Sequence, residues 1–478
     1  MSAVRAEVVA ALRPWCAARP KPESDALAAA LGASPNLADV WLTLAVMERA
    51  LPTEAQVRAA HRLAVLQGAE ALVADVVRSG RTARGGRQVE LLESTVVVDV
   101  RHTAETDLAT GIQRVARETV KRWDDKHEIT LVTWTEDGAS MRRLLPVERS
   151  TALHATPPVH GSTRVADRTI VIPVSGWYLL PELAAESWRT ERVATMAAFA
   201  GLTTAVIGFD CVPLTTAETV GEKMPAAFAR NLVAVANMDR VATISDAAGE
   251  EYSGWRRMLS ASGNPGPDIR SILLAAEPGS SSDADESEFL RLVGAGDEPL
   301  VLVVGSHEPR KNHRAVLQAA ELAWREGLEF RLVFVGGNSW NSANFSDMLI
   351  RLKAQGRMVD SVSALPDRLL WAAYRLSRFT VFTSINEGFG LPVAESLASG
   401  TPVLTSDYGS MKQIAAHGGA LVVDPRDDRA ILGGLRALLT DGDEYATLKK
   451  AAAGYVVRPW SDYADDLWTY FVEGADAP

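Results

Sequence analysis

The sequence predicts an α/β protein in which an all-helical segment precedes two doubly wound domains that face each other across a cleft. Three observations predict this fold class. Residues 1–78 have a helical pattern throughout, residues 94–245 alternate short β-branched runs with helical stretches, and residues 299–425 repeat that alternation. Strands that alternate with helices form parallel sheets covered on both faces, so two such sheets in succession are the most economical architecture.

The helical segment ends in a basic, glycine-rich stretch. Thr53 and Gln56 form a capping-box pattern ahead of a long periodic run. The stretch that follows at 78–90 is RSGRTARGGRQVE. It is typical of a flexible, solvated linker, and a phosphate- or lipid-binding patch is the weaker alternative. We therefore expect a helical segment with a basic linker over residues 1–88.

The first doubly wound domain is expected over residues 89–285. Helical stretches such as GIQRVARETVKRW separate its predicted strands, which lie at 94–100, 128–134, 168–174, 203–209 and 240–245. The pattern is then interrupted by the Ser/Asp/Glu-rich stretch EPGSSSDADESE at 277–288. We interpret this stretch as the connection between the two domains.

The second doubly wound domain is expected over residues 286–456. Its predicted strands lie at 299–306, 329–337, 358–365, 378–384, 401–407 and 419–425. Sheets of this kind bind ligands beyond the carboxyl ends of their strands, and two facing sheets form a cleft.

The composition excludes several classes of protein. The chain has 478 residues and a net charge of −11, so it lacks the basic excess of a general nucleic-acid binder. Cys16 and Cys211 lie far apart and suggest neither a disulfide framework nor a zinc site, which favours a reducing, cytoplasmic location. No run approaches the ~20 apolar residues of a membrane-spanning helix, so any membrane would be reached by peripheral contact.

The stretch NEGFGLPVAES, residues 386–396, carries the most informative motif. It follows a buried strand pattern and leads into a helix that ends at Gly400. Gly388 and Gly390 permit a tight turn and a close approach of a ligand, and Pro392 suits the start of a helix. The turn therefore directs N–H groups near Gly390 and Leu391, with the positive end of the helix dipole, at a phosphate.

Two glutamates, Glu387 and Glu395, lie on either side of this turn. A carboxylate repels phosphate, so we expect each of them to bind neutral hydroxyls at opposite ends of a diphosphate. A nucleotide-sugar has that order of parts, with a sugar on one side and a ribose on the other. The alternative, an ordinary strand–turn–helix with two surface glutamates, stays open for the turn alone because the full dinucleotide fingerprint is absent.

Two cations follow another predicted strand of the same domain. Arg310 and Lys311 lie just after the strand at 299–306, at the same sheet edge as the glycine turn. We expect both to neutralise a leaving diphosphate. No cluster of metal-ligating residues is visible, so the sequence predicts neither a metal nor another cofactor.

Over residues 298–470 the chain resembles the family-four, or group-one, retaining glycosyltransferases of the GT-B fold, which have two Rossmann-like domains. The block LWAAYRLSRFTVFTSINEGFGLPVAESLASGTPVLTSDYGSMKQIAAHGGALVVDP carries this resemblance. It implies that Glu387 contacts the donor sugar and Glu395 the ribose. It also implies that backbone N–H groups bind the diphosphate and sugar, at the positions Gly388, Phe389, Gly390 and Leu391. Ser306 occupies the place of a usual arginine, for which Arg310 is the expected substitute, and Gln413 replaces a frequent glutamate.

The first half of the chain resembles the family more faintly. DVRHTAETDLATGIQRVARE implies that Thr110 and Gly111 face the cleft. In VIGFDCVPL, Phe209 replaces a histidine and leaves Asp210 as the catalytic candidate, with a strand-end cap as the equal alternative. Trp340 is expected to line the donor pocket or to pack at its rim. RPWSDYADDLWTYF resembles a terminal helix, within 457–478, that crosses back to the first domain.

The resemblance implies a hexosyltransferase that acts with retention of configuration. Its donor would be a UDP-, GDP- or dTDP-sugar, and its acceptor a hydroxyl of a saccharide or lipid-linked glycan on the side of the first domain. A non-catalytic nucleotide-sugar-binding protein, a GT-B phosphorylase and an epimerase are the alternatives. For residues 1–78 we consider dimerisation, recruitment of a partner enzyme and positioning of the acceptor.

Overall fold

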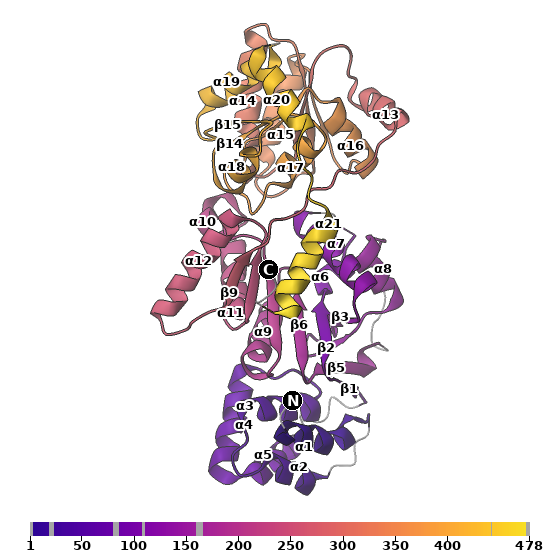
Figure 1. The fold of residues 1–478 in the computed structure, drawn as a ribbon, viewed down its shortest axis with the longest axis vertical. Helices are drawn as coiled ribbons and strands as arrows, with labels where there is room; N and C mark the ends of the chain where they lie inside the picture. Colours follow the sequence, from indigo (N-terminus) through magenta and orange to yellow (C-terminus); the bar gives the residue numbers. More distant parts are fainter. Residues whose placement is uncertain are drawn as a thin grey trace.

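The structure is a computed structural model that describes residues 3–18, 23–79, 86–107, 110–158, 166–440 and 442–474. Three parts of the molecule follow one another along its long axis (Figure 1). The N-terminal helices lie at one end, a nine-stranded sheet lies in the middle, and a six-stranded sheet lies at the other end. The predicted α/β fold with an added N-terminal helical segment is confirmed.

In the described part of the N-terminal segment there are five helices and a 3-10 turn. They are α1 (Ala3–Leu12), η1 (Arg13–Cys16), α2 (Ser24–Leu31), α3 (Leu37–Glu48), α4 (Glu54–Gln67) and α5 (Ala69–Arg78). The predicted capping box is present at the start of α4, where the Thr53 N–H donates to Gln56 Oε1 at 2.8 Å. Residues 80–85 of the basic linker expected at 78–90 lie outside the described residues, and residues 88–90 belong to a strand.

The N-terminal helices share a hydrophobic core with the nine-stranded sheet. Trp15 and Trp41 of the helices belong to the same buried cluster as Val171 of the sheet. Arg5 donates to the carbonyls of Val174 at 3.1 Å and Ala200 at 2.7 Å. The segment therefore packs as an extension of the first domain.

The nine-stranded sheet has the order β1-β5-β4-β3-β2-β6-β7-β8-β9. Its strands are β1 (Gln88–Leu92), β2 (Thr95–Asp99), β3 (Ile129–Trp134), β4 (Met141–Arg143), β5 (Thr169–Pro173), β6 (Gly176–Leu180), β7 (Thr203–Gly208), β8 (Arg240–Thr243) and β9 (Asp268–Ser271). All five predicted strands are present, as β2, β3, β5, β7 and β8. Four further strands were not predicted.

Strand β4 departs from the predicted parallel sheet, because it pairs antiparallel with β3 and β5. The turn at 135–140 closes a hairpin that returns the chain along β3, with the Thr135 N–H donating to the Ser140 carbonyl at 2.8 Å. Strand β6 escaped prediction because Gly176 opens it with a φ of 105° and its sequence, GWYLL, lacks β-branched residues.

Helices cover both faces of this sheet. They are α6 (Arg101–Glu105), α7 (Gly111–Lys126), α8 (Pro146–His154), α9 (Ser187–Phe199), α10 (Val212–Thr215), α11 (Met224–Val235) and α12 (Asp246–Ala261), with 3-10 turns η3 (Ala166–Arg168) and η4 (Ala217–Thr219). Helices α9 and α11 share a core with the N-terminal helices, whereas α7 and α8 pack in the cluster on the opposite face. The sheet is therefore doubly wound, as predicted.

The six-stranded sheet is parallel throughout, with the order β12-β11-β10-β13-β14-β15. Its strands are β10 (Leu300–Val304), β11 (Arg331–Val335), β12 (Val359–Val362), β13 (Phe379–Phe382), β14 (Val403–Ser406) and β15 (Ala420–Val423). Each lies within one of the six predicted runs.

The helices of the second domain again flank the sheet on two sides. They are α13 (Asp283–Val293), η5 (Pro309–Lys311), α14 (His313–Arg325), α15 (Ala343–Ala354), α16 (Asp367–Leu376), α17 (Leu391–Ala398), α18 (Gly409–Ala415), α19 (Asp428–Leu439) and α20 (Asp443–Ala453). Helices α14, α15 and α19 contribute to one buried cluster, and α13 and α16 contribute to another.

The predicted connection at 277–288 is only partly irregular. Ser282 caps α13, and its N–H donates to Asp285 Oδ2 at 2.8 Å. Acidic residues such as Asp283 suit the first turn because of the helix dipole. The Ser/Asp/Glu-rich stretch therefore contains the start of a helix as well as a linker. The limits placed between residues 88 and 89 and between 285 and 286 stay predictions.

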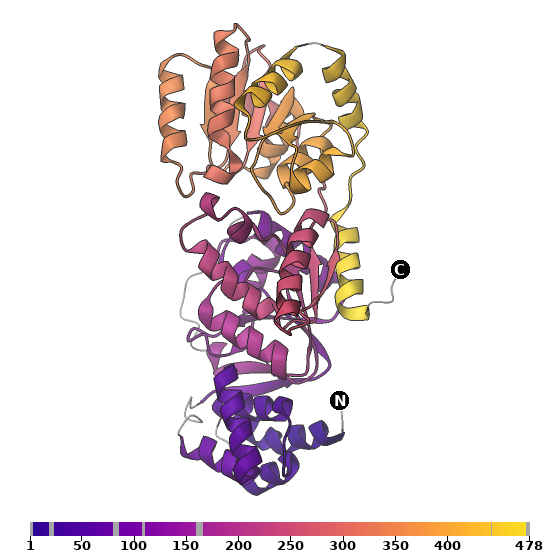
Figure 2. The same ribbon diagram turned by 90° about the vertical axis from the view of Figure 1, so that its left-hand side faces the viewer.

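The C-terminal helix returns to the first domain, where it lies beside α7 (Figures 1 and 2). It consists of α21 (Trp460–Trp468) and a π-helical turn, η6 (Thr469–Glu473). Trp123 Nε1 donates to the Ala464 carbonyl at 2.9 Å, and Trp460 is buried. Among the described residues, none of the helices combines the length and apolar character required to span a bilayer.

Candidate functional site

The predicted glycine turn joins the end of β13 to the start of α17. Gly390 caps the helix with a φ of 93°, in the left-handed region that glycine tolerates best. Pro392 occupies the first turn, where a missing N–H is harmless. In the part of the chain that the structure describes, the N–H groups of residues 388–391 donate to no protein acceptor. They are therefore free to bind an anion at the positive end of the helix.

Two cations meet on the carboxylate that begins this turn. Lys311 Nζ lies 2.6 Å from Glu387 Oε1, and Arg310 Nη1 lies 2.5 Å from Glu387 Oε2. Both cations come from η5, which follows β10, a strand adjacent to β13 in the sheet. Neighbouring parallel strands end at the same edge, which is why residues 76 positions apart in the sequence touch.

The electrostatics of this cluster keep Glu387 ionised. Burial by itself would raise the pKa of Glu387, but the charges of Arg310 and Lys311 and hydrogen bonds from Lys311 and Ser384 lower it to about 2. Burial lowers the pKa of Lys311, and the charge of Glu387 opposes that shift. The cluster is thus a preformed arrangement of two cations bridged by one carboxylate.

Neighbouring groups fix the geometry of the cluster. Ser384 Oγ donates to Glu387 Oε1 at 2.6 Å, and Arg310 Nη1 donates to the Asn386 carbonyl at 2.9 Å. Arg310 also pairs with Glu308 at 2.6 Å. The sequence reasoning missed Ser384 and Asn386, although Asn386 is the first residue of the motif and Ser384 lies two positions before it.

The first domain approaches the turn closely at Gly388. A Cβ added there would lie 2.4 Å from the carbonyl oxygen of Phe209 and 2.9 Å from Asp210 Oδ2. Ser245 Oγ donates to the Gly388 carbonyl at 2.5 Å. Gly388 is therefore required for the close contact of the two domains, and the contact brings Asp210 next to the turn.

Asp210 has an unusual acidity. Burial raises its pKa to about 6, and Glu251 and Glu387 push it in the same direction against the charge of Arg310. Asp210 Oδ1 also accepts from the Val212 N–H at 3.1 Å, as a strand-end cap would. Both interpretations of Asp210 that the sequence left open are therefore compatible with its surroundings.

Glu395 lies on α17 away from Glu387 and has partners of its own. It is buried, with 4% of its surface exposed. Arg114 Nη1 of α7 forms an ion pair with its Oε1, and Tyr374 Oη donates to its Oε2 at 2.8 Å. The sequence reasoning missed Arg114 and Tyr374. Arg114 lies one helical turn after Gly111, and that spacing was the available signal.

Of the other predicted site residues, some adjoin the glycine turn and others are taken up in packing. A Cβ at Gly111, the first residue of α7, would lie 3.7 Å from Leu391 Cδ1, so the start of α7 adjoins the turn. Thr110 is the preceding cap residue. The Phe389 side chain is buried in the cluster shared by both domains, which leaves only its backbone for a ligand. Trp340 is 37% exposed and donates to the Thr219 carbonyl at 3.1 Å, so it packs between the domains.

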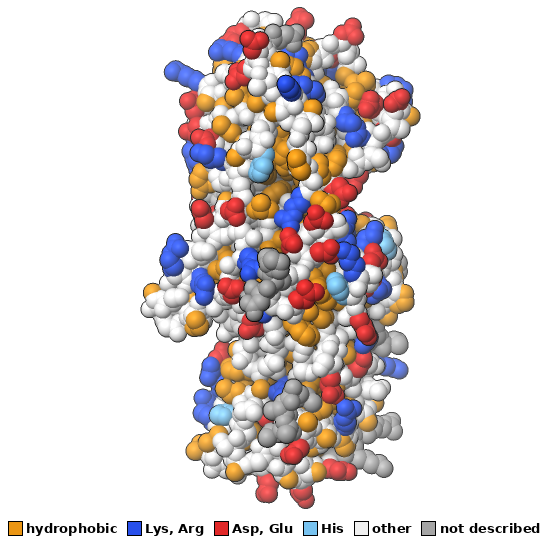
Figure 3. Space-filling view, viewed as in Figure 1, with side chains coloured by type: hydrophobic (Ala, Val, Ile, Leu, Met, Phe, Trp, Pro, Cys, Tyr) orange, Lys and Arg blue, Asp and Glu red, His pale blue; other side chains and the backbone are white. Residues whose placement is uncertain are grey.

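Among the described residues, no three or more His, Cys, Asp or Glu side chains are grouped so that they could hold a metal ion. The charged groups at the start of the turn are Arg310, Lys311, Glu387 and Glu308, with Asp210 beside them. Acidic and basic side chains are interspersed over the face of the molecule in Figure 3.

The chain is similar to several known proteins. Residues 286–454 match the family described as glycosyl transferases group 1. The serotype-specific mannosyltransferase WbdA of Escherichia coli is 28% identical over 335 residues, which cover 67% of this chain and 38% of that protein. The D-inositol 3-phosphate glycosyltransferase of Thermobispora bispora is 34% identical over 197 residues, or 39% of this chain and 46% of that protein. The chain thus spans less than half the length of either curated relative.

Among solved structures, Anabaena Alr3699/HepE in complex with UDP and glucose superposes with a TM-score of 0.58. The match covers 78% of this chain and 98% of that chain, at 11% sequence identity. Such a match shows the fold alone, which is GT-B with two Rossmann-like domains.

Proposed function

We propose that this chain, a GT-B protein whose residues 286–454 form a group 1 glycosyl transferase domain, transfers a hexose from a nucleoside diphosphate sugar to a hydroxyl group. One observation carries the proposal. Arg310 and Lys311 meet on Glu387 at the start of a turn whose N–H groups are free of protein acceptors. Cations and free N–H groups at a helix start are what a diphosphate requires.

The reaction needs charge stabilisation as the bond between the sugar and the diphosphate breaks. Negative charge grows on the departing diphosphate, and preorganised N–H groups with Arg310 and Lys311 stabilise it electrostatically. This assignment makes the transfer metal-independent, because the two cations supply the positive charge. The departing phosphate oxygen takes the proton of the acceptor hydroxyl, which favours retention of configuration.

The carboxylates then have separate tasks. Glu387, ionised at neutral pH by its two cations, accepts hydrogen bonds from hydroxyls of the donor sugar. Glu395 lies one helical turn inside α17 and accepts a hydrogen bond from a hydroxyl of the ribose. This hydrogen bond replaces the ion pair of Glu395 with Arg114. Asp210 contacts the acceptor hydroxyl or the sugar from the side of the first domain.

The relatives suggest which donor to test first. The matched protein of Escherichia coli is named a mannosyltransferase, and the matched Anabaena structure contains UDP and glucose. We therefore propose a mannose-type donor first and a UDP-hexose second, with a saccharide or lipid-linked glycan as acceptor. Cys16 and Cys211 are free thiols, which agrees with a cytoplasmic location.

Ligand binding followed by transfer tests the proposal. The melting temperature of the full chain should rise with GDP-mannose, UDP-glucose or dTDP-glucose, because a ligand that binds the folded state stabilises it. With the bound donor and an oligosaccharide acceptor, NMR of the product's anomeric proton should show the configuration of the donor. Binding without hydrolysis or transfer would favour a non-catalytic nucleotide-sugar-binding protein. Phosphate-dependent cleavage of a glycan would favour a phosphorylase, and no binding of any donor would overturn the proposal.

A further inference from the structure

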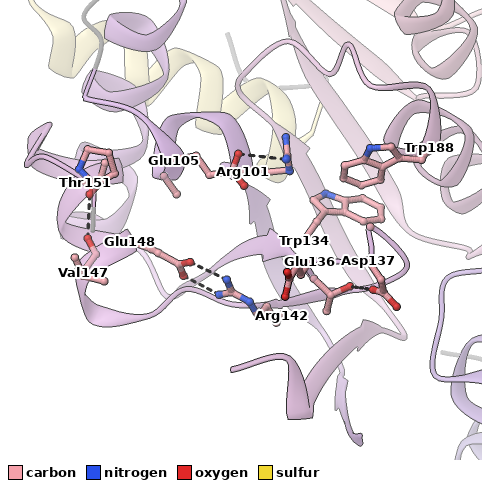
Figure 4. Close-up of a pocket in the computed structure, with 14 residues that line it drawn as sticks. Arg101, Glu105, Trp134, Glu136, Asp137, Arg142, Val147, Glu148, Thr151 and Trp188 are labelled. Atoms are coloured by element: carbon pink, nitrogen blue, oxygen red, sulfur yellow. Dashed lines mark hydrogen bonds and ion pairs between the residues drawn. The ribbon is translucent and has the colours of Figure 1, made fainter. Parts of the chain in front are cut away.

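A cavity lies wholly within the first domain (Figure 4). Its volume is about 590 Å³, enough for a small organic ligand. Residues from α6, the β3–β4 hairpin, α8 and the start of α9 line it. None of the lining residues belongs to the second domain or to the predicted nucleotide-sugar site.

Two tryptophans form one wall of this cavity. Trp134 and Trp188 pack edge to face, with ring centroids 5.3 Å apart. The Trp134 indole is fixed by a hydrogen bond of 2.8 Å to Asp99, and a Cβ at Gly138 would lie 2.9 Å from the Trp188 ring. The guanidinium of Arg101 lies 5.2 Å from the centre of the Trp188 ring. The cavity therefore offers a rigid aromatic surface at its edge.

The charges of the lining disfavour an anionic ligand. Four acidic side chains, Glu105, Glu136, Asp137 and Glu148, outnumber the two basic ones, Arg101 and Arg142. Arg142 is itself fully engaged, because it makes two contacts of 2.7 Å with Glu148 and one of 3.0 Å with Asp167. A phosphate would meet net negative charge here, in contrast to the Arg310 and Lys311 site. Hydroxyl groups, however, can donate to the carboxylates.

Buried hydrogen bonds and ion pairs fix the position of α6, the helix that carries Arg101 and Glu105. Glu182 accepts hydrogen bonds of 2.8 Å from the N–H groups of His102 and Thr103 at the start of α6. Arg189, which is fully buried, joins Glu182 to Asp99 with ion pairs of 2.7 and 2.8 Å. The polar side of the cavity is therefore preorganised, as a specific binding site requires.

The cavity lies within reach of an extended ligand that also occupies the place where transfer is proposed. Glu105 and Gly111 are six positions apart, so their Cα atoms lie within roughly 22 Å of each other even if the chain between them is extended. Gly111 adjoins Leu391 of the glycine turn. A ligand of several linked units could therefore occupy both places.

We propose that this cavity binds a neutral saccharide unit of the acceptor glycan. The apolar face of a sugar ring packs on Trp188 in place of the Arg101 guanidinium, which in the free protein lies over that ring and pairs with Glu105 at 3.2 Å. Hydroxyls of the sugar donate to Glu105 and Glu136. The proposal rests on the transferase function but names its own site, which neither the sequence reasoning nor the matched relatives point to. A saccharide held here would increase the effective concentration of the acceptor end at the transfer site.

Saturation-transfer NMR on the full chain tests the cavity without the donor. The probes are mannotriose, maltotriose and cellotriose, and UDP is the anionic comparison. At least one trisaccharide should bind the wild type. Both W188A and the shape-preserving double variant E105Q/E136Q should weaken that binding at least tenfold. The control W255A replaces a half-buried tryptophan on α12, outside the cavity, and should bind as the wild type does.

Donor binding separates the two proposals. The cavity variants should keep the melting-temperature rise with the nucleotide sugar, but should raise KM for the oligosaccharide acceptor at least tenfold. If no donor binds the wild type but binding of a trisaccharide still depends on Trp188, the transferase function is overturned and the saccharide site is supported. If no trisaccharide binds, or if all variants bind as the wild type does, the saccharide site is overturned.

Discussion

Arg114 of the first domain and Glu395 of the second form an ion pair that joins the two domains across 281 positions of sequence. The Glu395 side chain is 5% exposed and that of Arg114 is 27% exposed, so water screens the pair only weakly. Tyr374 holds the other carboxylate oxygen. In the proposed reaction the ribose takes the place of Arg114, so nucleotide binding and the contact between the domains are coupled.

A double-mutant cycle should detect this pair. We expect R114M and E395Q to show a coupling of about 1–3 kcal/mol in the free energy of unfolding, because contacting and poorly solvated residues are not additive. Urea unfolding of the wild type, both single variants and the double variant measures it. The exposed pair of Lys126 and Asp465 is the control, with an expected coupling of about 0–1 kcal/mol. Equal coupling for the two pairs would contradict a buried interdomain link.

Removing Lys311 should impair turnover far more than it impairs the fold. K311A deletes one preorganised cation beside the proposed diphosphate, and the loss of one such group lowers kcat by about a hundredfold. Steady-state transfer with the identified donor measures this effect. The control K412A removes a lysine whose side chain is 64% exposed and should leave kcat unchanged. Wild-type turnover in folded K311A would reject the assignment of the site.

A methyl group at Gly388 should disturb the contact between the domains. The added Cβ of G388A would lie 2.4 Å from the Phe209 carbonyl, a distance at which one domain must move. Since a small displacement of catalytic groups can slow a reaction about a hundredfold, we expect kcat/KM to fall by that order. G433A is the matched control, because a Cβ there meets nothing within 4 Å on α19. Unchanged kinetics in G388A would show that this close contact is dispensable.

Asp210 should give the protein a distinct pH dependence. Its pKa of about 6 in the folded chain exceeds the ordinary value of 3.8, so the folded state binds this proton more tightly than the unfolded state does. The resulting stabilisation is complete below about pH 4 and is lost as the pH rises through 6. D210N cannot ionise at this position. Its free energy of unfolding should therefore rise by up to about 3 kcal/mol relative to that of the wild type between pH 4 and pH 8.

Unfolding of wild type and D210N at both pH values measures this difference. The same ionisation should appear in catalysis if Asp210 acts as a carboxylate, with a wild-type kcat/KM that falls below pH 6. D210N should lack that limb of the profile. A relative stability of D210N that does not change with pH would place the pKa of Asp210 near its ordinary value.

The sequence by itself located the turn between Glu387 and Glu395 and the strand ends that carry Arg310 and Lys311. These features are local, because glycine, proline and β-branched residues act on the few residues around them. The shared edge of a parallel sheet then made the meeting of the two segments predictable. The roles of these residues in transfer remain the proposal made above.

Other features depended on how distant segments pack. Strand β4 forms because a hairpin places it between β3 and β5. Its three residues are too few to show the alternating pattern that predicts a strand. The cavity beside Trp188 likewise needs four elements brought together. Only the tertiary structure decided that Arg114 meets Glu395, because that contact follows from the docking of two domains rather than from any spacing along the chain.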